Sequence, residues 1–281
     1  MLTACSFGKK TTVEKGKAGH FIIATDKDFS PFEFQDEDGN TVGFDVDILE
    51  AIAKDQGFTY ELKAVGWDAA VDALQKKSDS IDGMIAGASI TEERKGAGWI
   101  FSNGYFTATQ TVFVKNNSEI KGFEDLKEKV VGAVDKTLGY KYAEEVQEQH
   151  QFELKAYETY TDLYKAVEKG EVIAGFGDTP AVLYEVVNKS LKLKTLKETE
   201  NEGLSYGFVI SNPEKQKLLD LFNAGLENIK KNGTYNKIVI KYFGETETET
   251  ETTTAPPTEP ETESETEEEG EEEYYEEEYD D

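Results

Sequence analysis

Short apolar runs, typical of strands, alternate with amphipathic stretches, typical of helices, along most of this 281-residue chain. A first series has predicted strands at 20–25, 58–62 and 81–86, separated and followed by predicted helices at 43–57, 69–77 and from 91 onward. A strand–helix–strand order places helices on both faces of a sheet. The series therefore predicts an α/β unit with a mostly parallel sheet.

Particular residues define the ends of the predicted helices. Gly57 ends the first helix, and Asp68, Thr91 and Thr161 are expected to cap later helices, since their side-chain oxygens can accept from free backbone N–H groups. Helical periodicity places four apolar residues on the buried face of the first helix: Val46, Leu49, Ile52 and Ala53.

A second series of the same kind follows the first. Its predicted strands lie at 112–115, 129–134, 152–157 and 172–176, and its predicted helices at 121–127, 140–149, 161–170 and from 179 onward. A last predicted strand at 206–211 and a helix at 213–231 are left over, which suggests that the first lobe is discontinuous. We expect lobe 1 at 20–104 plus 207–243, connecting strands at 105–109 and 202–206, and lobe 2 at 110–201.

The negative charge of the chain is concentrated at one end. Of 58 acidic residues, 19 lie in the Glu/Thr-rich segment 245–281, which has no Lys or Arg, whereas the rest of the chain has 39 acidic and 30 basic residues. Such a tail buries too little apolar surface to offset its ordering entropy, so residues 244–281 are predicted to be disordered. No basic stripe is present, so nucleic acid is not an expected partner.

A single cysteine, Cys5, excludes an intramolecular disulfide. The sequence Leu-Thr-Ala-Cys at 2–5 resembles a bacterial lipobox, in which the cysteine is lipidated, and the polar segment behind it is typical of a flexible tether up to residue 19. The alternative is a lone thiol in a flexible end. No segment has the ~18 apolar residues of a membrane span, so contact with a membrane is expected only through a lipid at Cys5.

Polar side chains follow several predicted strands, where ligands bind in open parallel sheets. Arg94, in the first turn of a helix, and nearby backbone amides are suited to a carboxylate. Asp178, with the Gly87 carbonyl and the Ser89 hydroxyl, is suited to an ammonium group, and Asp26 to a polar side chain. Phe29 and Trp67 also lie past strand ends, where their flat faces can enclose a side-chain stem. The alternatives are turn or cap residues for the aspartates and core positions for the aromatic residues.

Signals for catalysis or cofactors are weak. The two histidines, His20 and His150, have no other candidate ligand near them in sequence, and no nucleophile, phosphate-binding or dinucleotide-binding motif occurs. We predict no catalytic residue, no metal and no cofactor.

Six segments together resemble one protein family. The chain resembles the extracellular solute-binding proteins (family 3) of polar amino-acid ABC transporters, and among them the glutamine-binding members most. The matching segments, in the order of the family, are ATDKDFSPFEF (24–34), VGFDVDILEAIAK (42–54), AGASITEERK (86–95), FSNGYF (101–106), GDTPAVLY (177–184) and NGTYNKI (232–238).

The resemblance implies a type II periplasmic-binding-protein fold, with two lobes, a two-strand hinge and a ligand buried between the lobes. By position in the family, Arg94 and Ser89 hold the α-carboxylate, Gly87, Ser89 and Asp178 hold the α-ammonium, and Asp26 faces the ligand side chain. The same comparison adds Ala86, Thr137 and Leu138 to the site and keeps Phe29 and Trp67 around the side chain.

Three departures from glutamine-binding members bear on the ligand. Val134 stands where they carry lysine, Gly177 where one carries histidine, and Lys136 opens a loop that usually reads close to GTT or GTG. Loss of that lysine removes a donor to a side-chain carbonyl, and Asp26 can equally neutralise a basic side chain. Glutamine therefore stays the first expectation and basic amino acids the second, whereas glutamate would place two carboxylates together.

The expected protein is a monomeric, lipid-anchored receptor outside the cytoplasm that captures a polar L-amino acid and passes it to an ABC permease. Two alternatives share the fold: a dehydratase acting on prephenate or arogenate, and the sensing domain of a receptor. The dehydratase needs a general acid, for which Asp26 is the one candidate in the sequence.

Overall fold

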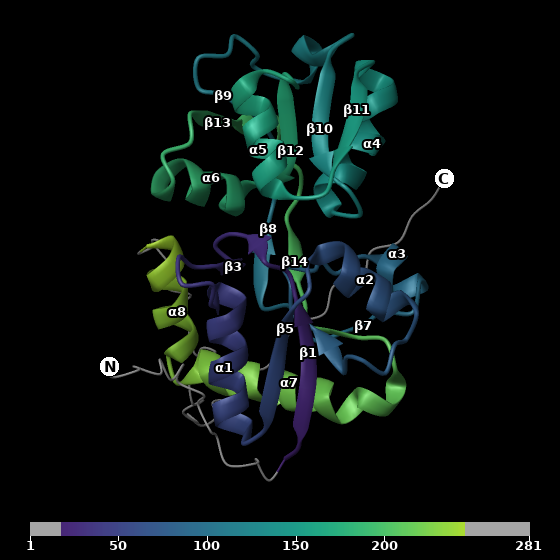
Figure 1. The fold of residues 1–281 in the computed structure, drawn as a ribbon, viewed down its shortest axis with the longest axis vertical. Coiled ribbons are helices and arrows are strands. Elements are labelled where there is room, and N and C mark those ends of the chain that lie inside the picture. Colours follow the sequence, from purple (N-terminus) through teal and green to yellow (C-terminus); the bar gives the residue numbers. More distant parts are fainter. Residues whose placement is uncertain (1–17, 245–281) are drawn as a thin grey trace, which may run out of the picture. The chain divides into compact units, whose positions relative to one another are not determined.

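The computed structural model describes residues 18–244. Within these residues, two five-stranded sheets form two regions that we call lobe 1 and lobe 2 (Figure 1). Lobe 1 contains β1 (His20–Thr25), β5 (Thr59–Ala64), β6 (Gly83–Met84), β7 (Ile100–Phe101) and β15 (Val209–Ile210). Lobe 2 contains β9 (Gln110–Lys115), β10 (Val130–Val134), β11 (Glu153–Tyr157), β12 (Ala174–Asp178) and β13 (Leu193–Leu196).

The two sheets have the same strand pattern. Their orders are β5-β1-β6-β15-β7 and β11-β10-β12-β9-β13. In each sheet the first three strands are parallel to one another, and the fourth is antiparallel to both of its neighbours. The carboxyl ends of three parallel strands therefore meet at one edge of each sheet, where a ligand site is expected.

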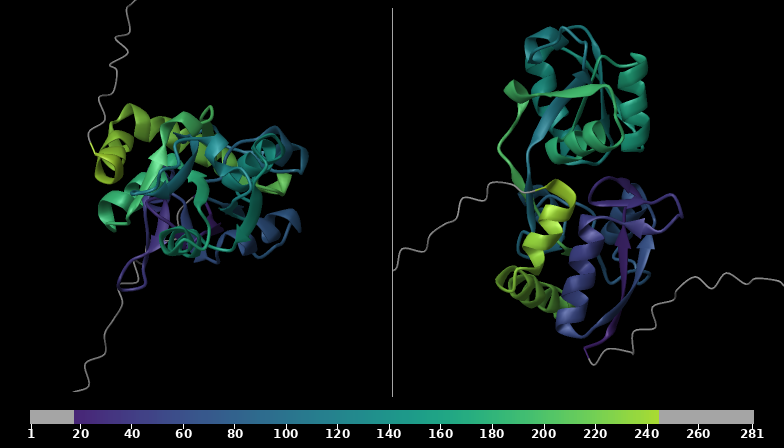
Figure 2. Two further views of the ribbon diagram at one scale, coloured as in Figure 1. Left: turned by 90° about the horizontal axis from the view of Figure 1, so that it is seen from above. Right: turned by 90° about the vertical axis from the view of Figure 1, so that its left-hand side faces the viewer.

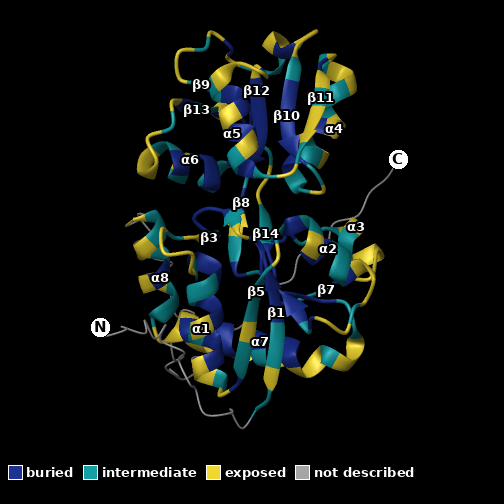
Figure 3. Cartoon of the chain, in the orientation of Figure 1, coloured by how far each residue is buried: buried dark blue, intermediate teal, exposed yellow. Residues whose placement is uncertain are grey.

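Helices cover both faces of each sheet. Lobe 1 has α1 (Phe44–Gln56), α2 (Trp67–Gln75), α3 (Glu92–Gly96), α7 (Gln216–Lys231) and α8 (Thr234–Phe243), and lobe 2 has α4 (Leu138–His150), α5 (Tyr160–Lys169) and α6 (Thr179–Asn188). Neighbouring side chains of β1 show why both faces are apolar: Ile23 joins the core beneath α1 and α7, and Ala24 joins the core beneath α2. Figure 3 shows the buried inner strands and the exposed outer helix faces.

Two antiparallel strands run between the lobes, β8 (Phe106–Ala108) and β14 (Leu204–Tyr206), as the right-hand view of Figure 2 shows. They overlap the connections predicted at 105–109 and 202–206. An isolated bridge joins Tyr206 to Ser89, so the end of β14 also contacts the segment that follows β6. The architecture is the expected mixed α/β fold with two sheet-containing lobes, whereas the exact domain boundaries stay a prediction.

Several predicted helix ends are wrong because other groups satisfy the free N–H groups. Helix α2 begins at Trp67, one residue before the predicted Asp68 cap, and Gly66 occupies the cap position. Thr159, not Thr161, caps α5 and accepts from Asp162 N at 3.1 Å. The Thr91 cap is confirmed, since its hydroxyl accepts from Arg94 N at 3.1 Å.

Other differences concern element limits. Val46 is only half-buried, because the buried face of α1 turns toward Phe44, Asp45 and Ile48. The predicted helix at 121–127 is a short 3-10 helix, η1 (Phe123–Leu126). The predicted helix at 213–231 begins with another 3-10 helix, η3 (Pro213–Lys215), and a third, η2, spans Lys197–Thr199.

Some elements were not predicted at all. They are helix α8 and the small antiparallel sheet of β2 (Asp28–Phe29), β3 (Glu33–Gln35) and β4 (Thr41–Val42). The predictions for Cys5, the tether and the acidic tail lie outside the described residues.

Candidate ligand-binding site

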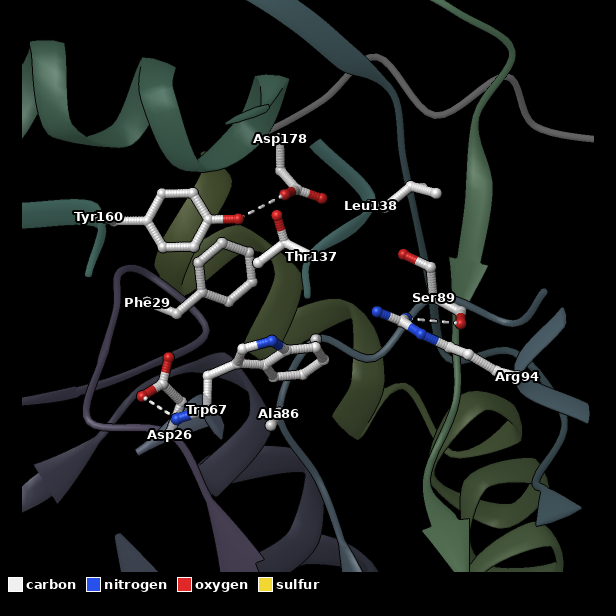
Figure 4. Close-up of a pocket in the computed structure, with 11 residues that line it drawn as sticks. Asp26, Phe29, Trp67, Ala86, Ser89, Arg94, Thr137, Leu138, Tyr160 and Asp178 are labelled. Atoms are coloured by element: carbon white, nitrogen blue, oxygen red, sulfur yellow. Dashed lines mark hydrogen bonds between the residues drawn. The ribbon is translucent and has the colours of Figure 1, made fainter. Parts of the chain in front are cut away.

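A small cavity lies between the lobes, with an empty volume of about 310 Å³ that includes the open solvent at its mouth. All ten residues predicted for the ligand site line it, together with Tyr160 (Figure 4). The lining consists of Asp26, Phe29, Trp67, Ala86, Gly87, Ser89, Arg94, Thr137, Leu138, Tyr160 and Asp178. Lobe 1 supplies the residues up to Arg94, and lobe 2 the others.

Strand ends place most of these side chains. Asp26 directly follows β1, Ala86 to Ser89 follow β6, and Asp178 is the last residue of β12. Thr137 caps α4, where its hydroxyl accepts from Tyr140 N at 3.2 Å and donates to Val134 O at 2.6 Å. The edges at which the parallel strands of the two sheets end thus line one cavity.

Asp178 is held by three donors. Gln110 Nε2 donates to its Oδ1 at 2.7 Å, Tyr160 OH donates to its Oδ2 at 3.1 Å, and Tyr206 OH also donates to Oδ1. The side chain is 4% exposed. Burial raises the pKa of the Asp178 carboxyl, and the three hydrogen bonds and Arg94 oppose that rise. The site thus holds an acidic group whose orientation is fixed before any ligand arrives.

Arg94 is anchored on both sides of the cavity. Its guanidinium donates to Ser89 O at 2.9 Å and to Lys136 O, in lobe 2, at 3.2 Å. The guanidinium carbon also lies 5.3 Å from the ring centre of Trp67 and 5.2 Å from that of Trp99. Burial lowers the pKa of Arg94 and Asp178 opposes this shift, but a guanidinium stays charged at neutral pH. It is therefore suited to pair with a carboxylate.

Asp26 lies at another part of the cavity, near aromatic side chains. Its Oδ1 accepts from Lys27 N at 2.7 Å and from Trp67 N at 3.0 Å, so it satisfies a free N–H at the start of α2. Burial is the main cause that raises the pKa of its carboxyl. Phe29 stacks on Tyr160 across the lobes, with ring centres 4.9 Å apart. The capping role considered for Asp26 is thus present, and the side chain still lines the cavity.

Gly87 lines the cavity and also contacts Asp45, which lies behind the lining. It has a φ of +54°, and a Cβ added there would lie 2.4 Å from the Phe29 ring. Its N–H donates to Asp45 Oδ2 at 2.8 Å. A side chain at this position would displace an aromatic residue of the lining, so the site needs glycine.

The sequence reasoning missed Tyr160 in the lining and three residues that support it. Tyr160 follows β11, a parallel strand, so the rule that identified Asp26 and Asp178 would also have found it. Gln110 and Tyr206, which hold Asp178, and Trp99, which contacts Arg94, come from antiparallel strands or loops. The strand-end rule gives no signal for them.

Two features are absent from the part of the chain that the structure describes. Between Ala18 and Gly244, no helix is both long enough and apolar enough to cross a membrane. In the same part of the chain, no group of three or more His, Cys, Asp or Glu side chains is arranged to hold a metal ion.

The model of one protein family, described as bacterial extracellular solute-binding proteins, family 3, matches residues 21–245. The chain belongs to this family. The two-lobed fold of this solute-binding protein is accordingly the type II periplasmic-binding-protein fold.

Named relatives cover most of the chain. An arginine-binding periplasmic protein of Mannheimia haemolytica is 32% identical over 79% of this chain and 91% of the relative. A probable histidine-binding protein of Neisseria gonorrhoeae is 29% identical over 87% of this chain and 91% of the relative. This solute-binding protein therefore has relatives named for different amino acids.

Solved structures agree with this relationship. The arginine-, lysine-, histidine-binding protein ArtJ of Geobacillus stearothermophilus has a TM-score of 0.72 and 34% identity, covering 80% of this chain and 96% of ArtJ. An ancestral arginine-binding protein, solved with arginine and with glutamine, has a TM-score of 0.72 and 36% identity. The match covers 80% of this chain and 98% of the ancestral protein. An ancestral amino-acid-binding protein described as a precursor of cyclohexadienyl dehydratase has a TM-score of 0.71 and 32% identity, covering 81% and 96%.

Proposed function

We propose that this solute-binding protein captures a cationic L-amino acid between its lobes, with arginine as the first candidate. The observation that carries the proposal is the charge of the cavity lining, which has two carboxyls, Asp26 and Asp178, against one guanidinium, Arg94. With both carboxyls ionised, the lining has one more negative than positive charge. A ligand with a net positive charge balances it, since a buried charge needs an opposite partner.

Arg94 and Asp178 are suited to the part that all L-amino acids share. The Arg94 guanidinium would bind the α-carboxylate with free N–H groups at the start of α4, and Asp178 would bind the α-ammonium with Gly87 and Ser89. Arg94 comes from lobe 1 and Asp178 from lobe 2, so one ligand would contact both lobes. Its binding would then favour closure of the lobes.

The side-chain end favours a long cationic group. Phe29, Tyr160 and Trp67 present aromatic faces there, and a guanidinium gains from contact with such faces as well as from a carboxylate such as Asp26. An adjoining cavity shares Asp26, Trp67 and Tyr160 with the first. Its rim adds three acidic residues against one basic residue: Asp28, Asp68 and Glu158 against Lys27.

Glutamine, the first expectation from the sequence, becomes the second candidate. The ancestral arginine-binding protein that resembles this chain was solved with either arginine or glutamine. Both ligands have the same amino-acid core and a long planar side-chain terminus, and they differ in charge. The names of the arginine- and histidine-binding relatives support the cationic choice.

We extend the proposal to transport. The protein would deliver its ligand to an ABC permease, act as a monomer and remain outside the cytoplasm, anchored through a lipid on Cys5. The lipobox-like residues 2–5 support the anchor, and relatives named as periplasmic binding proteins support the location.

We propose a binding role and no enzymatic one. Asp26, the candidate acid of a dehydratase, is engaged with two backbone N–H groups and lies beside aromatic faces. Incubation with prephenate or arogenate, followed by absorbance, tests this directly: product formation at a catalytic rate would replace the binding proposal with an enzymatic one.

Titration calorimetry with arginine and citrulline tests the ligand class sharply, because citrulline has nearly the shape of arginine without its charge. We expect arginine to bind at least about tenfold more tightly, which is about 1.4 kcal/mol. Lysine, ornithine, histidine, glutamine and glutamate complete the panel. Equal binding of arginine and citrulline, or tighter binding of glutamine, would contradict a cationic ligand, and no binding of any amino acid would contradict the function.

A further inference from the structure

Two buried carboxyl groups, those of Glu33 and Asp45, lie next to the cavity but outside its lining. Glu33 is the first residue of β3 and Asp45 the second residue of α1, and both are 0% exposed. Backbone hydrogen bonds bring the two segments together: Asp45 N donates to Phe32 O at 2.9 Å. Gly43 permits this approach, because a Cβ there would lie 2.1 Å from Phe32 O.

The hydrogen bonds of this pair are incomplete if both groups are ionised. Asp45 Oδ2 accepts from Gly87 N at 2.8 Å and from Tyr105 OH at 2.6 Å. With both carboxyls ionised, no N–H or O–H donor among the described residues serves Asp45 Oδ1 or the carboxyl oxygens of Glu33. Leaving three buried carboxylate oxygens without a donor is expensive.

Among the described residues, the titratable groups with the largest effect on Glu33 are acidic. Asp45, Asp26 and Asp178 each disfavour a further negative charge there. Asp45 is within hydrogen-bonding reach of Glu33 and of the neutral phenol of Tyr105. Tyr235, from α8, also faces Asp45. A proton is therefore the simplest partner for the free oxygens.

The pKa shifts of the two carboxyls have the directions that a shared proton requires. Burial, followed by the charge of Asp45, raises the pKa of the Glu33 carboxyl well above its ordinary value. Burial also raises the pKa of Asp45 to about 6, and the donors Tyr105, Gly87 and Glu33 oppose that rise. The Asp45 carboxyl raises the pKa of Glu33 and the Glu33 carboxyl lowers that of Asp45, so Glu33 is the member of the pair suited to donate.

We propose that Glu33 and Asp45 share one proton, with the Glu33 carboxyl donating to Asp45 Oδ1, and that this pair positions Gly87 in the ligand-binding cavity. The proton supplies the donor that Asp45 Oδ1 lacks. The other oxygen of Asp45 can then remain fixed on Gly87 and Tyr105. Because Gly87 lies against Phe29, a shift of Gly87 would disturb two residues of the lining. Glu33 and Asp45 are positioning residues, since neither lines the cavity.

A pH-dependent site follows from this arrangement. As the pH rises past the value at which the pair loses its shared proton, two adjacent buried groups become negative and the support of Gly87 weakens. Ligand affinity should then fall, approaching about tenfold per pH unit if binding requires the protonated pair. The α-ammonium of the ligand also titrates in the alkaline range, so the wild-type protein alone does not isolate the effect.

The matched variant is Glu33→Gln, whose amide can donate to Asp45 Oδ1 but does not titrate, and Glu33→Leu removes the donor. With arginine and glutamine as probes, we expect Glu33→Leu to lose much more affinity at pH 6 than Glu33→Gln. We also expect the affinity of the wild type relative to Glu33→Gln to decline as the pH rises through the range in which the shared proton is lost. Identical pH profiles for the wild type and Glu33→Gln would overturn the proposal.

Infrared spectroscopy tests the shared proton without a ligand. The wild type at pH 8 should show the carbonyl stretch of a buried protonated carboxyl group, with its shift in D₂O, and Glu33→Gln should lack this band. The same spectrum in both proteins would overturn the shared proton even if Glu33→Leu does not fold. The binding arm relies on the proposed function, whereas the infrared arm does not. Failure of both probes to bind would therefore count against the function alone.

Discussion

The two acidic groups of the cavity differ in the surroundings that hold them. Asp178, at the end expected to bind the amino-acid core, is oriented by three side-chain donors. Asp26, at the side-chain end, is fixed by two backbone N–H groups and opens onto a second cavity with an acidic rim. The core end is thus preorganised for one shape, while the side-chain end selects mainly by charge and by aromatic contact. Substitutions at the two ends should therefore have different consequences.

Arg94→Ala should have the largest effect, and it should affect every ligand alike. Removing one partner of a buried charge pair costs about 2–5 kcal/mol, or roughly 30-fold to several thousand-fold in affinity. Titration calorimetry with arginine, citrulline and glutamine would measure the loss.

The control for Arg94→Ala lies on the same helix. Lys95 is exposed and pairs with Glu92 at 2.7 Å on the surface, so Lys95→Ala should change the affinity by no more than about twofold. Near-normal binding by Arg94→Ala, or an equal loss in both variants, would show that Arg94 does not hold the carboxylate.

Asp26→Asn should separate the two ends most clearly. Asparagine Oδ1 can still accept from Lys27 N and Trp67 N, so the start of α2 is kept and the negative charge is lost. A hydrogen bond to a charged group contributes about 1.5–3 kcal/mol, so arginine affinity should fall by roughly 10- to 150-fold. Citrulline affinity should change little. Calorimetry with the two ligands measures this ratio, and an unchanged ratio would remove Asp26 from side-chain recognition.

The pH dependence of unfolding offers a test of Asp26 without a ligand. Burial raises the pKa of Asp26 above its ordinary 3.8, so the folded chain keeps this proton to a higher pH than the unfolded chain. The stability that this retained proton contributes is complete below about pH 3.8. It is lost as the pH rises through the pKa of Asp26 in the folded chain, by at most about 1.4 kcal/mol per pH unit.

Asparagine does not titrate, so Asp26→Asn should gain stability relative to the wild type between about pH 4 and the folded pKa of Asp26. Urea unfolding of both proteins at several pH values measures the difference. A difference that stays constant from pH 4 to pH 8 would show that the carboxyl titrates normally.

The sequence predicted the residues that line the cavity better than the limits of the elements around them. Asp26, Ser89 and Asp178 could be found because the carboxyl ends of parallel strands meet at one edge, whatever the precise limits of each strand. Tyr160 follows the same rule and was overlooked. Gln110 and Tyr206 orient Asp178 from antiparallel strands, whose pairing depends on a register that periodicity does not reveal.

Close backbone contacts were equally invisible in the sequence. The approach of Gly43 to Phe32 O places Asp45 beside Glu33, and no helical or strand period encodes it. The start of α2 was misplaced for a related reason, since Asp26, distant in sequence, accepts from Trp67 N and the helix begins before the predicted Asp68 cap. At α5 a different local residue, Thr159, is the cap.

Thr161→Val should have the smallest effect, because the bond it removes involves Asp28 on the rim of the adjoining cavity and no residue that lines the ligand-binding cavity. Thr161 Oγ1 in lobe 2 donates to Asp28 Oδ1 in lobe 1 at 2.6 Å, and Thr161 N donates to Asp28 Oδ2 at 2.9 Å. Valine keeps the backbone hydrogen bond and loses the side-chain one, which for a part-buried carboxylate contributes about 1–1.5 kcal/mol, or roughly five- to 13-fold in affinity. Since this contact joins the lobes, its loss should lower the affinity of arginine, citrulline and glutamine by the same factor.

Thr195→Val, on the edge strand β13, serves as the control that should leave affinity unchanged. A loss confined to one ligand in calorimetry would instead assign Asp28 and Thr161 to side-chain recognition.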